Sequence, residues 1–225
     1  TMTVDPQQAP DEAAEVVIGF EKGRPVSLNG EKKSLLKIII ELNRIAGANG
    51  YGRIDMIEDR VVGIKSRECY ECPASLALIA AHKSLETMCL DHDTLHAKEA
   101  LEGQWATLVY DGLWYSPLKQ ALDAFNTQEF VTGEVRAKFY KGTLTVTGRR
   151  AANSLYVEAL ATYSDGDEFD RTASKGFIQL HSLPSQTWSK QQGPAYEHAK
   201  AVKAGKVKRF VAASSPVAEG VSASA

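Results

Sequence analysis

Two segments that alternate apolar with polar side chains are joined by a two-residue turn in the second half of the chain. The segments are residues 131–140 and 143–147, and Lys141-Gly142 lies between them. Such a turn between two alternating segments is typical of a tight β-hairpin, because glycine accepts the positive φ that these turns need. This is the strongest hairpin signal in the sequence, and it makes an antiparallel sheet the starting point for the fold.

The N-terminal part of the chain gives a second hairpin signal and several helix signals. Short apolar runs at residues 16–20 and 25–28 flank Glu21-Lys22-Gly23, and Asn29-Gly30 follows the second run. Other segments show strand or helix periodicity and are bounded by capping residues and prolines. We predict strands at residues 53–57 and 60–64, which meet at an acidic corner formed by Glu58 and Asp59, and helices at residues 35–46, 74–88, 94–109, 117–125, 155–160 and 172–182, the last ended by Pro184.

Together these elements predict an α+β fold, with an antiparallel-rich sheet of hairpins, packed helices and a flexible C-terminal tail. We expect residues 1–14 to form a linker and residues 15–184 to form one domain. Residues 185–225 are expected to be a variable, mobile tail, because apolar periodicity nearly disappears there while Lys, Ala and Ser accumulate.

Charge and hydropathy narrow the classes of function. The 225 residues include 26 Lys and Arg against 28 Asp and Glu, so the chain lacks the cationic surplus that binds nucleic acid or an anionic membrane. No apolar run reaches the length of about 18 residues needed to cross a bilayer, and residues 1–15 show no secretory signal. Three cysteines do not make a disulfide framework and favour a reducing compartment. We expect a cytoplasmic protein with no nucleic-acid or membrane partner.

One motif could carry metal or redox chemistry. Cys69 and Cys72 form a C-x-x-C pair, which can hold half of a zinc site or exchange disulfides. His82, His92 and His96 follow, but at no spacing that is typical of a zinc site. We therefore expect the cysteines to be small, partly exposed side chains and no metal to be bound.

A glycine-rich stretch could in principle approach a phosphate. Gly47, Gly50 and Gly52 supply little side-chain bulk, and backbone amides in such a stretch can bind anions. Neither a P-loop nor a dinucleotide-binding motif follows them. These glycines are better explained as the end of one helix and the entrance to the next strand.

The segment of residues 53–71 carries both charge signs between apolar residues. A zwitterionic ligand would need this mixture, because each ligand charge must be paired when it leaves water. A surface ion-pair network explains the same residues, and composition alone favours that second interpretation. The positions concerned are Arg53, Asp55, Glu58, Asp59, Arg60, Lys65, Arg67, Glu68, Tyr70 and Glu71.

The same segment resembles the signature of the argininosuccinate synthase family. Residues 52–60 read GRIDMIEDR and residues 63–73 read GIKSRECYECP, where the family typically has GRIDMVENR, then GIKSR, then YEAP or YETP. Further matches follow in order, among them GLWYSP at residues 112–117 and GFI at residues 176–178. The resemblance extends over roughly residues 4–184.

The resemblance implies an ATP-dependent carbon–nitrogen ligase of arginine biosynthesis and the urea cycle. Such an enzyme joins citrulline and aspartate, with ATP and magnesium, to give argininosuccinate, AMP and pyrophosphate. The family's N-terminal domain binds the nucleotide through a Ser-Gly-Gly loop, and this chain contains no Ser-Gly-Gly. The resemblance therefore covers only the C-terminal synthetase and multimerisation domain. It implies an N-terminal nucleotide-binding domain as partner, a homotetramer, and no activity of this chain alone; a plant-type enzyme would work in the chloroplast stroma.

Matched position by position, the resemblance assigns Glu58 and Tyr70 to citrulline binding and no catalytic residue to this chain. A carboxylate can pair with the ammonium of citrulline, and a phenol can donate or accept without adding charge. Four further motif residues are expected to orient the site through ion pairs, namely Arg53, Arg60, Lys65 and Arg67.

Asp59 stands where the family usually has asparagine. The extra charge beside Glu58 is expected to weaken the site by like-charge repulsion unless Arg60 or Lys65 offsets it. Two other functions stay open. One is a non-catalytic oligomerisation or binding module derived from the family. The other is a metal or thiol-redox protein built on Cys69 and Cys72.

Overall fold

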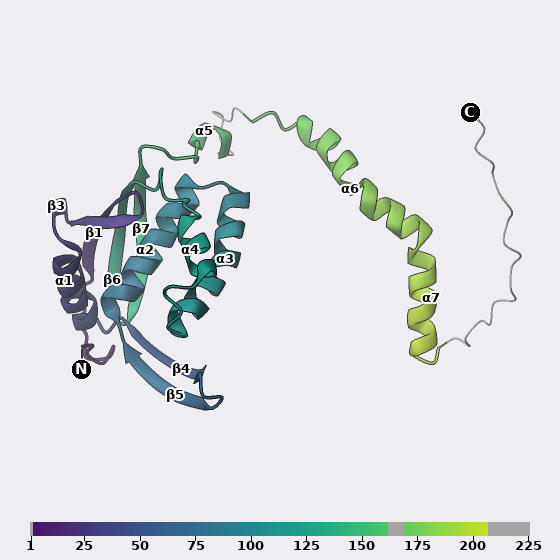
Figure 1. Ribbon diagram of the computed structural model, residues 1–225. Coiled ribbons are helices and arrows are strands. Elements are labelled where there is room, and N and C mark those ends of the chain that lie inside the picture. Colours follow the sequence, from purple (N-terminus) through teal and green to yellow (C-terminus); the bar gives the residue numbers. More distant parts are fainter. Residues whose placement is uncertain (1, 162–168, 207–225) are drawn as a thin grey trace, which may run out of the picture. The chain divides into compact units, whose positions relative to one another are not determined.

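The computed structural model describes residues 2–161 and 169–206. The chain divides into two compact units, Thr1–Ala161 and Thr162–Ala225, which are described separately below (Figure 1). The first unit has the predicted α+β fold, with antiparallel sheets and packed helices. The predicted domain boundaries at residues 14 and 184 are not tested by this division and stay predictions.

A five-stranded antiparallel sheet forms the centre of the first unit. Its strand order is β3-β2-β1-β6-β7, and both hairpins predicted from the sequence are confirmed. The turns Lys22-Gly23 and Lys141-Gly142 have positive φ at both residues, 47° and 74° in the first and 46° and 82° in the second, as tight hairpin turns require. The strands are β1 (Ala14–Glu21), β2 (Arg24–Leu28), β3 (Glu31–Lys32), β6 (Gly133–Tyr140) and β7 (Thr143–Ala151).

Side chains alternate between the two faces of the sheet along each strand, and one face therefore collects the apolar side chains. Helices α1 (Leu35–Ala48) and α2 (Pro73–Cys89) pack against that face (Figure 1). Each helix contributes one apolar stripe, as the spacing of its apolar residues predicts. The fully buried core members include Ile18 and Leu28 from the sheet, Val135, Ala137 and Phe139 from β6, Ile38, Leu42 and Ala46 from α1, and Ala77, Ala81 and Leu85 from α2.

Helices α3 (His92–Tyr110), α4 (Pro117–Ala124) and α5 (Glu158–Ala161) complete the first unit. The Asp91 side chain caps α3 by accepting from two backbone amides, and the Ser116 hydroxyl caps α4 by accepting from Lys119 N at 3.2 Å. These caps confirm the predicted starts of α3 and α4 to within a few residues. The short helix predicted at residues 155–160 begins only at Glu158.

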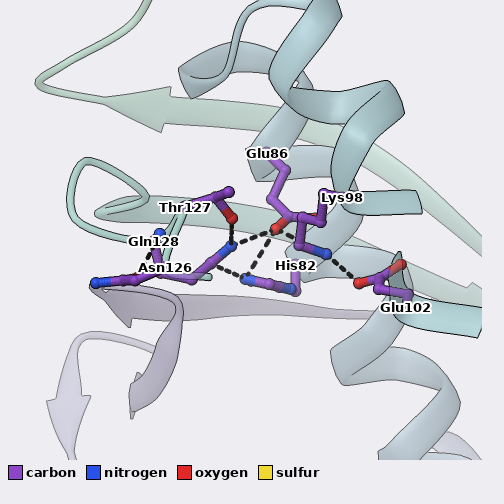
Figure 2. A network of polar contacts seen from close by, with 7 residues as sticks. All are labelled: His82, Glu86, Lys98, Glu102, Asn126, Thr127 and Gln128. Carbon is purple, nitrogen blue, oxygen red and sulfur yellow. Dashed lines mark hydrogen bonds and ion pairs between the residues drawn. The ribbon is translucent and has the colours of Figure 1, made fainter. Parts of the chain in front are cut away.

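A buried polar network joins α2 and α3 to the connection between α4 and β6 (Figure 2). Glu86, which is 2% exposed, accepts a hydrogen bond from Gln128 Nε2 at 2.7 Å and lies 3.2 Å from Lys98 Nζ. His82 Nε2 lies 2.7 Å from Gln128 Oε1, and Lys98 also pairs with Glu102. A buried charge needs such partners, because an unpaired one is costly.

The charged segment forms a separate two-stranded antiparallel hairpin of β4 (Arg53–Asp59) and β5 (Lys65–Glu71), which projects from the helical layer (Figure 1). The predicted strand at residues 60–64 and the predicted corner at Glu58 and Asp59 are wrong. Residues 60–64 are the turn instead, because Arg60 N donates to Ile64 O at 2.8 Å and Gly63 has a φ of 83°. The β-branched residues at this tip are highly exposed, Val62 by 80%.

Glycines shape the passage from α1 into β4, as predicted. Gly50 has a φ of 73° and Gly52 a φ of 113°, values that residues with a side chain rarely adopt. A Cβ at Gly52 would also overlap the backbone of Pro73, the first residue of α2. Residues 2–13 lie nearby, with Thr3 and Ala9 buried and Val4 N donating to Gly47 O at 3.0 Å.

The described part of the second unit contains helices α6 (Ala173–Gln191) and α7 (Gly193–Lys203). The predicted helix end at Pro184 is wrong, since α6 continues through it; a proline removes a single backbone donor and can be tolerated inside a helix at a cost. Residues 193–203 were also expected in the tail, yet Pro194 lies in the first turn of α7, where no amide donor is needed. The remainder of the predicted tail, residues 207–225, lies outside the described residues. No helix among the described residues is long and apolar enough to span a membrane.

Candidate functional site

The β4–β5 hairpin sorts its charged side chains onto two faces. Glu58 lies opposite Ser66, and Ile54 lies opposite Tyr70. Because side chains alternate along a strand and directly paired residues share a face, Glu58, Ser66 and Tyr70 lie together. Arg53, Asp55, Asp59, Lys65 and Arg67 lie on the opposite face.

The first face holds a cluster built around Glu58, whose side chain is only 12% exposed. Tyr70 OH donates to Glu58 Oε2 at 3.0 Å, and Arg60 Nη1 lies 3.1 Å from Glu58 Oε1. Arg60 Nη2 also reaches Glu68 Oε1, at 3.3 Å. The structure thus brings Glu58, Tyr70 and Arg60 together from the two strands and the turn between them.

Electrostatics fix the protonation states in this cluster. The hydrogen bond to the Glu58 carboxylate, followed by partial burial, raises the pKa of the Tyr70 hydroxyl above its usual value. The charge of Glu58, followed by that of Glu68, raises the pKa of Arg60. At neutral pH the phenol therefore remains a donor and the guanidinium remains charged. The cluster offers a carboxylate, a hydroxyl and a cation within a few ångströms of one another.

The second face carries ion pairs that are exposed to solvent. Arg67 binds both carboxylate oxygens of Asp55, at 2.9 and 2.6 Å, and this contact lowers the pKa of Asp55. Lys65 Nζ lies 2.5 Å from Asp59 Oδ1. Asp59 is therefore paired with Lys65 and points away from the Glu58 face. Lys65 and Arg67, expected to orient the site, are not brought to Glu58 or Tyr70 and form pairs of the kind that contributes little to stability.

Arg53, the fourth expected orienting residue, secures the base of the hairpin. Its Nε donates to Thr3 Oγ1 at 2.7 Å and its Nη2 donates to Val4 O at 2.7 Å. Glu71 on the paired strand accepts from Thr3 N at 3.2 Å. These contacts hold residues 2–4 against the hairpin, which also borders a cavity of about 830 Å³ lined in part by Arg53 and Tyr70.

Two residues at this site, Ser66 and Tyr110, were not singled out from the sequence, and Glu68 was singled out only as one of the charged positions. Ser66 and Glu68 share a face with Glu58, and Tyr110 of α3 donates from its hydroxyl to Asp59 O at 3.4 Å. Ser66 and Glu68 belong to the same motif as Tyr70, so alternation along β5 would have placed them if that strand had been predicted.

Outside the hairpin, the first unit has a second cavity, with a volume of about 870 Å³. Its lining includes His82, Lys98 and Gln128 of the polar network in Figure 2, and also Trp105. His82 Nε2 contacts Gln128, whereas the rings of His92 and His96 on α3 lie next to each other, with centroids 4.0 Å apart and planes tilted by 52°. Within the described residues, no group of three or more His, Cys, Asp or Glu side chains could hold a metal ion.

The cysteines of the C-x-x-C pair are both free thiols in the structure. Cys69 is exposed on β5, and Cys72 is the N-terminal cap residue of α2, where its backbone amide donates to Gly52 O at 2.8 Å. The third cysteine, Cys89, is buried, and burial raises the pKa of its thiol. The predicted absence of a bound metal stays a prediction.

The structure thus defines an antiparallel α+β domain whose projecting hairpin presents a carboxylate, a phenol and a guanidinium together, groups that can bind partners of either charge sign. Comparison with known proteins identifies the family to which this domain belongs. The model of the arginosuccinate synthase C-terminal domain matches residues 1–188. The chain belongs to the argininosuccinate synthase family, as its C-terminal domain.

Curated relatives agree with this assignment. The chain is 55% identical over 190 residues to an argininosuccinate synthase of Rubrobacter xylanophilus, which covers 84% of this chain and 46% of the relative. It is 52% identical over 187 residues to the argininosuccinate synthase of Aquifex aeolicus, covering 81% of this chain and 47% of that protein. That of Halalkalibacterium halodurans is 52% identical over 190 residues, with 84% and 46% covered. The chain therefore spans about half the length of the curated relatives it matches.

Proposed function

We propose that this chain is the C-terminal half of an argininosuccinate synthase and that its hairpin binds citrulline. The observation that carries the proposal is the contact between Glu58 and Tyr70, at 3.0 Å, inside the segment that resembles the family signature. In this proposal the Glu58 carboxylate pairs with the citrulline ammonium. Tyr70 donates to Glu58 and can accept a further hydrogen bond from the ligand head group.

The proposed reaction joins citrulline and aspartate with ATP and magnesium, and releases argininosuccinate, AMP and pyrophosphate. The nucleotide is assigned to an N-terminal domain, because the glycine-rich stretch of this chain is used for packing; Gly52 lies against Pro73 and not at a phosphate-binding turn. This half therefore contributes substrate binding and no catalytic residue. Before citrulline binds, Arg60 orients Glu58 directly, whereas Arg53 supports the hairpin at its base.

We extend the proposal to a homotetramer in the cytoplasm, with the N-terminal domain and its substrates as partners. Helices α6 and α7 are proposed to contact other subunits. Their apolar side chains are exposed in the second unit, and contact with another subunit would bury them. Leu180 is 71% exposed and Phe177 64%. A non-catalytic oligomerisation module would use the same surfaces, so activity has to be measured.

The test measures citrulline-dependent AMP release with the nucleotide-binding half present, on the same polypeptide or as a second chain. Activity is expected with both halves and not with this chain alone.

Glu58→Gln keeps the shape of the side chain but removes its charge. A hydrogen bond to a charged group contributes about 1.5–3 kcal/mol, so the KM for citrulline should rise on the order of 10- to 100-fold. The KM values for aspartate and ATP should change far less.

Glu134→Gln is the matched control. Glu134 is another strand glutamate in an ion pair, with Arg150 at 2.9 Å, but it lies on β6. It should leave all three KM values unchanged. If Glu58→Gln raises the three KM values together while lowering the melting temperature, Glu58 is a structural ion-pair partner and the binding role is refuted. Turnover by the purified 225-residue chain would refute the assignment of the nucleotide to a second half.

A further inference from the structure

Two polar atoms near the turn of the hairpin are buried without a hydrogen-bond partner. They are Glu58 Oε1 and Ser66 Oγ. Both belong to directly paired residues, so they lie on the same face of the hairpin. Arg60 Nη1 is 3.1 Å from Glu58 Oε1 but does not form a hydrogen bond with it.

A buried polar atom without a hydrogen bond is costly, and native structures contain few of them. Among the described residues, the same condition holds for one other side-chain atom, Asn49 Oδ1, which is not on the hairpin. Two such atoms on directly paired residues therefore indicate a place where a further group completes the bonding. Both atoms can accept hydrogen bonds, and one of them carries negative charge.

The group that satisfies both atoms is a primary ammonium. It has three N–H donors and a positive charge, so it can donate to the carboxylate and to the hydroxyl at the same time. We propose that Ser66 is a further substrate-binding residue, whose hydroxyl accepts a hydrogen bond from the same ammonium group that pairs with Glu58. This inference rests on the proposed function, which brings citrulline to Glu58.

Access to these atoms involves Arg60. Its side chain is 45% exposed and contacts both Glu58 and Glu68. It can therefore move off Glu58 and keep its second ion pair, at 3.3 Å to Glu68 Oε1. The ligand ammonium then takes the place of the guanidinium at Glu58 Oε1 and gains the Ser66 hydroxyl, to which Arg60 forms no hydrogen bond.

The test uses the enzyme with its nucleotide-binding half present. Ser66→Ala should raise the KM for citrulline by about 10-fold, the lower end for a hydrogen bond to a charged group, and Ser66→Thr, which keeps the hydroxyl, should restore it in large part. The control is Ser34→Ala, because Ser34 caps α1 without any side-chain hydrogen bond. It should leave the KM unchanged.

An analogue separates binding from structure. The compound 5-ureidopentanoate has the ureido and carboxylate groups of citrulline but lacks the ammonium. Its inhibition constant should be nearly the same for the wild type and Ser66→Ala, since the lost hydrogen bond would have gone to the ammonium. An equal loss for citrulline and for the analogue would overturn the proposal in favour of a structural role for Ser66.

Unchanged citrulline KM in Ser66→Ala, with Glu58→Gln impaired as expected, also refutes the Ser66 proposal and leaves the proposed function in place. If the wild-type protein with both halves neither turns over nor binds citrulline, the proposed function fails, and the role of Ser66 fails with it.

Discussion

Glu86 is expected to contribute more to stability than any exposed ion pair of this domain. Its side chain is 3% exposed and has three partners, His82 on the same helix, Lys98 on α3 and Gln128 in the connection before β6 (Figure 2). Glu86→Gln keeps the volume of the side chain and removes its charge. The change weakens the charged hydrogen bond from Gln128 Nε2 at 2.7 Å and the ion pair with Lys98 at 3.2 Å.

The size of the effect follows from burial. A hydrogen bond to a charged group contributes about 1.5–3 kcal/mol, and Lys98, whose side chain is 14% exposed, would be left with Glu102 as its remaining carboxylate. Glu102 keeps Lys98 from becoming an unpaired buried charge. Glu86→Gln should therefore lower the free energy of unfolding by about 2–3 kcal/mol, less than the loss seen when a buried charge is left without any partner. In a chain of this size, each kcal/mol lost from the free energy of unfolding lowers the melting temperature by about 2–4 °C. The melting temperature of Glu86→Gln should therefore fall by roughly 4–12 °C.

Urea and thermal unfolding followed by circular dichroism measure this difference. Glu102→Gln is the control, because Glu102 pairs with the same Lys98 while its side chain is 43% exposed. It should cost less than about 1 kcal/mol. Equal losses in the two variants, or a loss below about 1 kcal/mol in Glu86→Gln, would show that burial does not strengthen these contacts and would refute the reasoning.

Two further outcomes are expected. Tyr70→Phe should raise the KM for citrulline in the enzyme with both halves and change the melting temperature of this chain little, because the lost hydroxyl bonds only to Glu58 on an exposed hairpin; a large drop in melting temperature would assign the phenol to folding instead. Dialysis against EDTA should leave the melting temperature unchanged, since a structural zinc at Cys69 and Cys72 would contribute folding energy directly. A fall of many degrees that zinc reverses would contradict the prediction that these cysteines hold no metal.

The five-stranded sheet was predictable because one of its faces is buried. Alternation in residues 131–140 and the turn Lys141-Gly142 specify β6 and β7 locally, and the structure confirms both. The charged hairpin has no buried face of its own, so β5 need not alternate apolar with polar residues. Val61 and Val62 resemble a strand in composition, yet Gly63 and the hydrogen bond from Arg60 to Ile64 place them in the turn.

Because β5 was not predicted, the sequence could not assign the site residues to the two faces of the hairpin. Motif resemblance named Glu58 and Tyr70, and the structure brings them together at 3.0 Å. Without β5, however, alternation could not show that Lys65 and Arg67 face away from them. The continuation of α6 through Pro184 was missed for a different reason: a proline is a strong local signal for a helix end, and contacts from the rest of the helix can outweigh it.

The β4–β5 hairpin pairs only with itself, and this has a consequence for binding. A two-stranded hairpin is marginally stable alone, so its order depends on the contacts at its base and at Tyr110. Local opening of these strands should require less free energy than opening of the five-stranded sheet. Any fraction of time spent open lowers the apparent ligand affinity by that same fraction. The proposed affinity for citrulline should therefore depend partly on residues such as Arg53 and Tyr110, which need never touch the ligand.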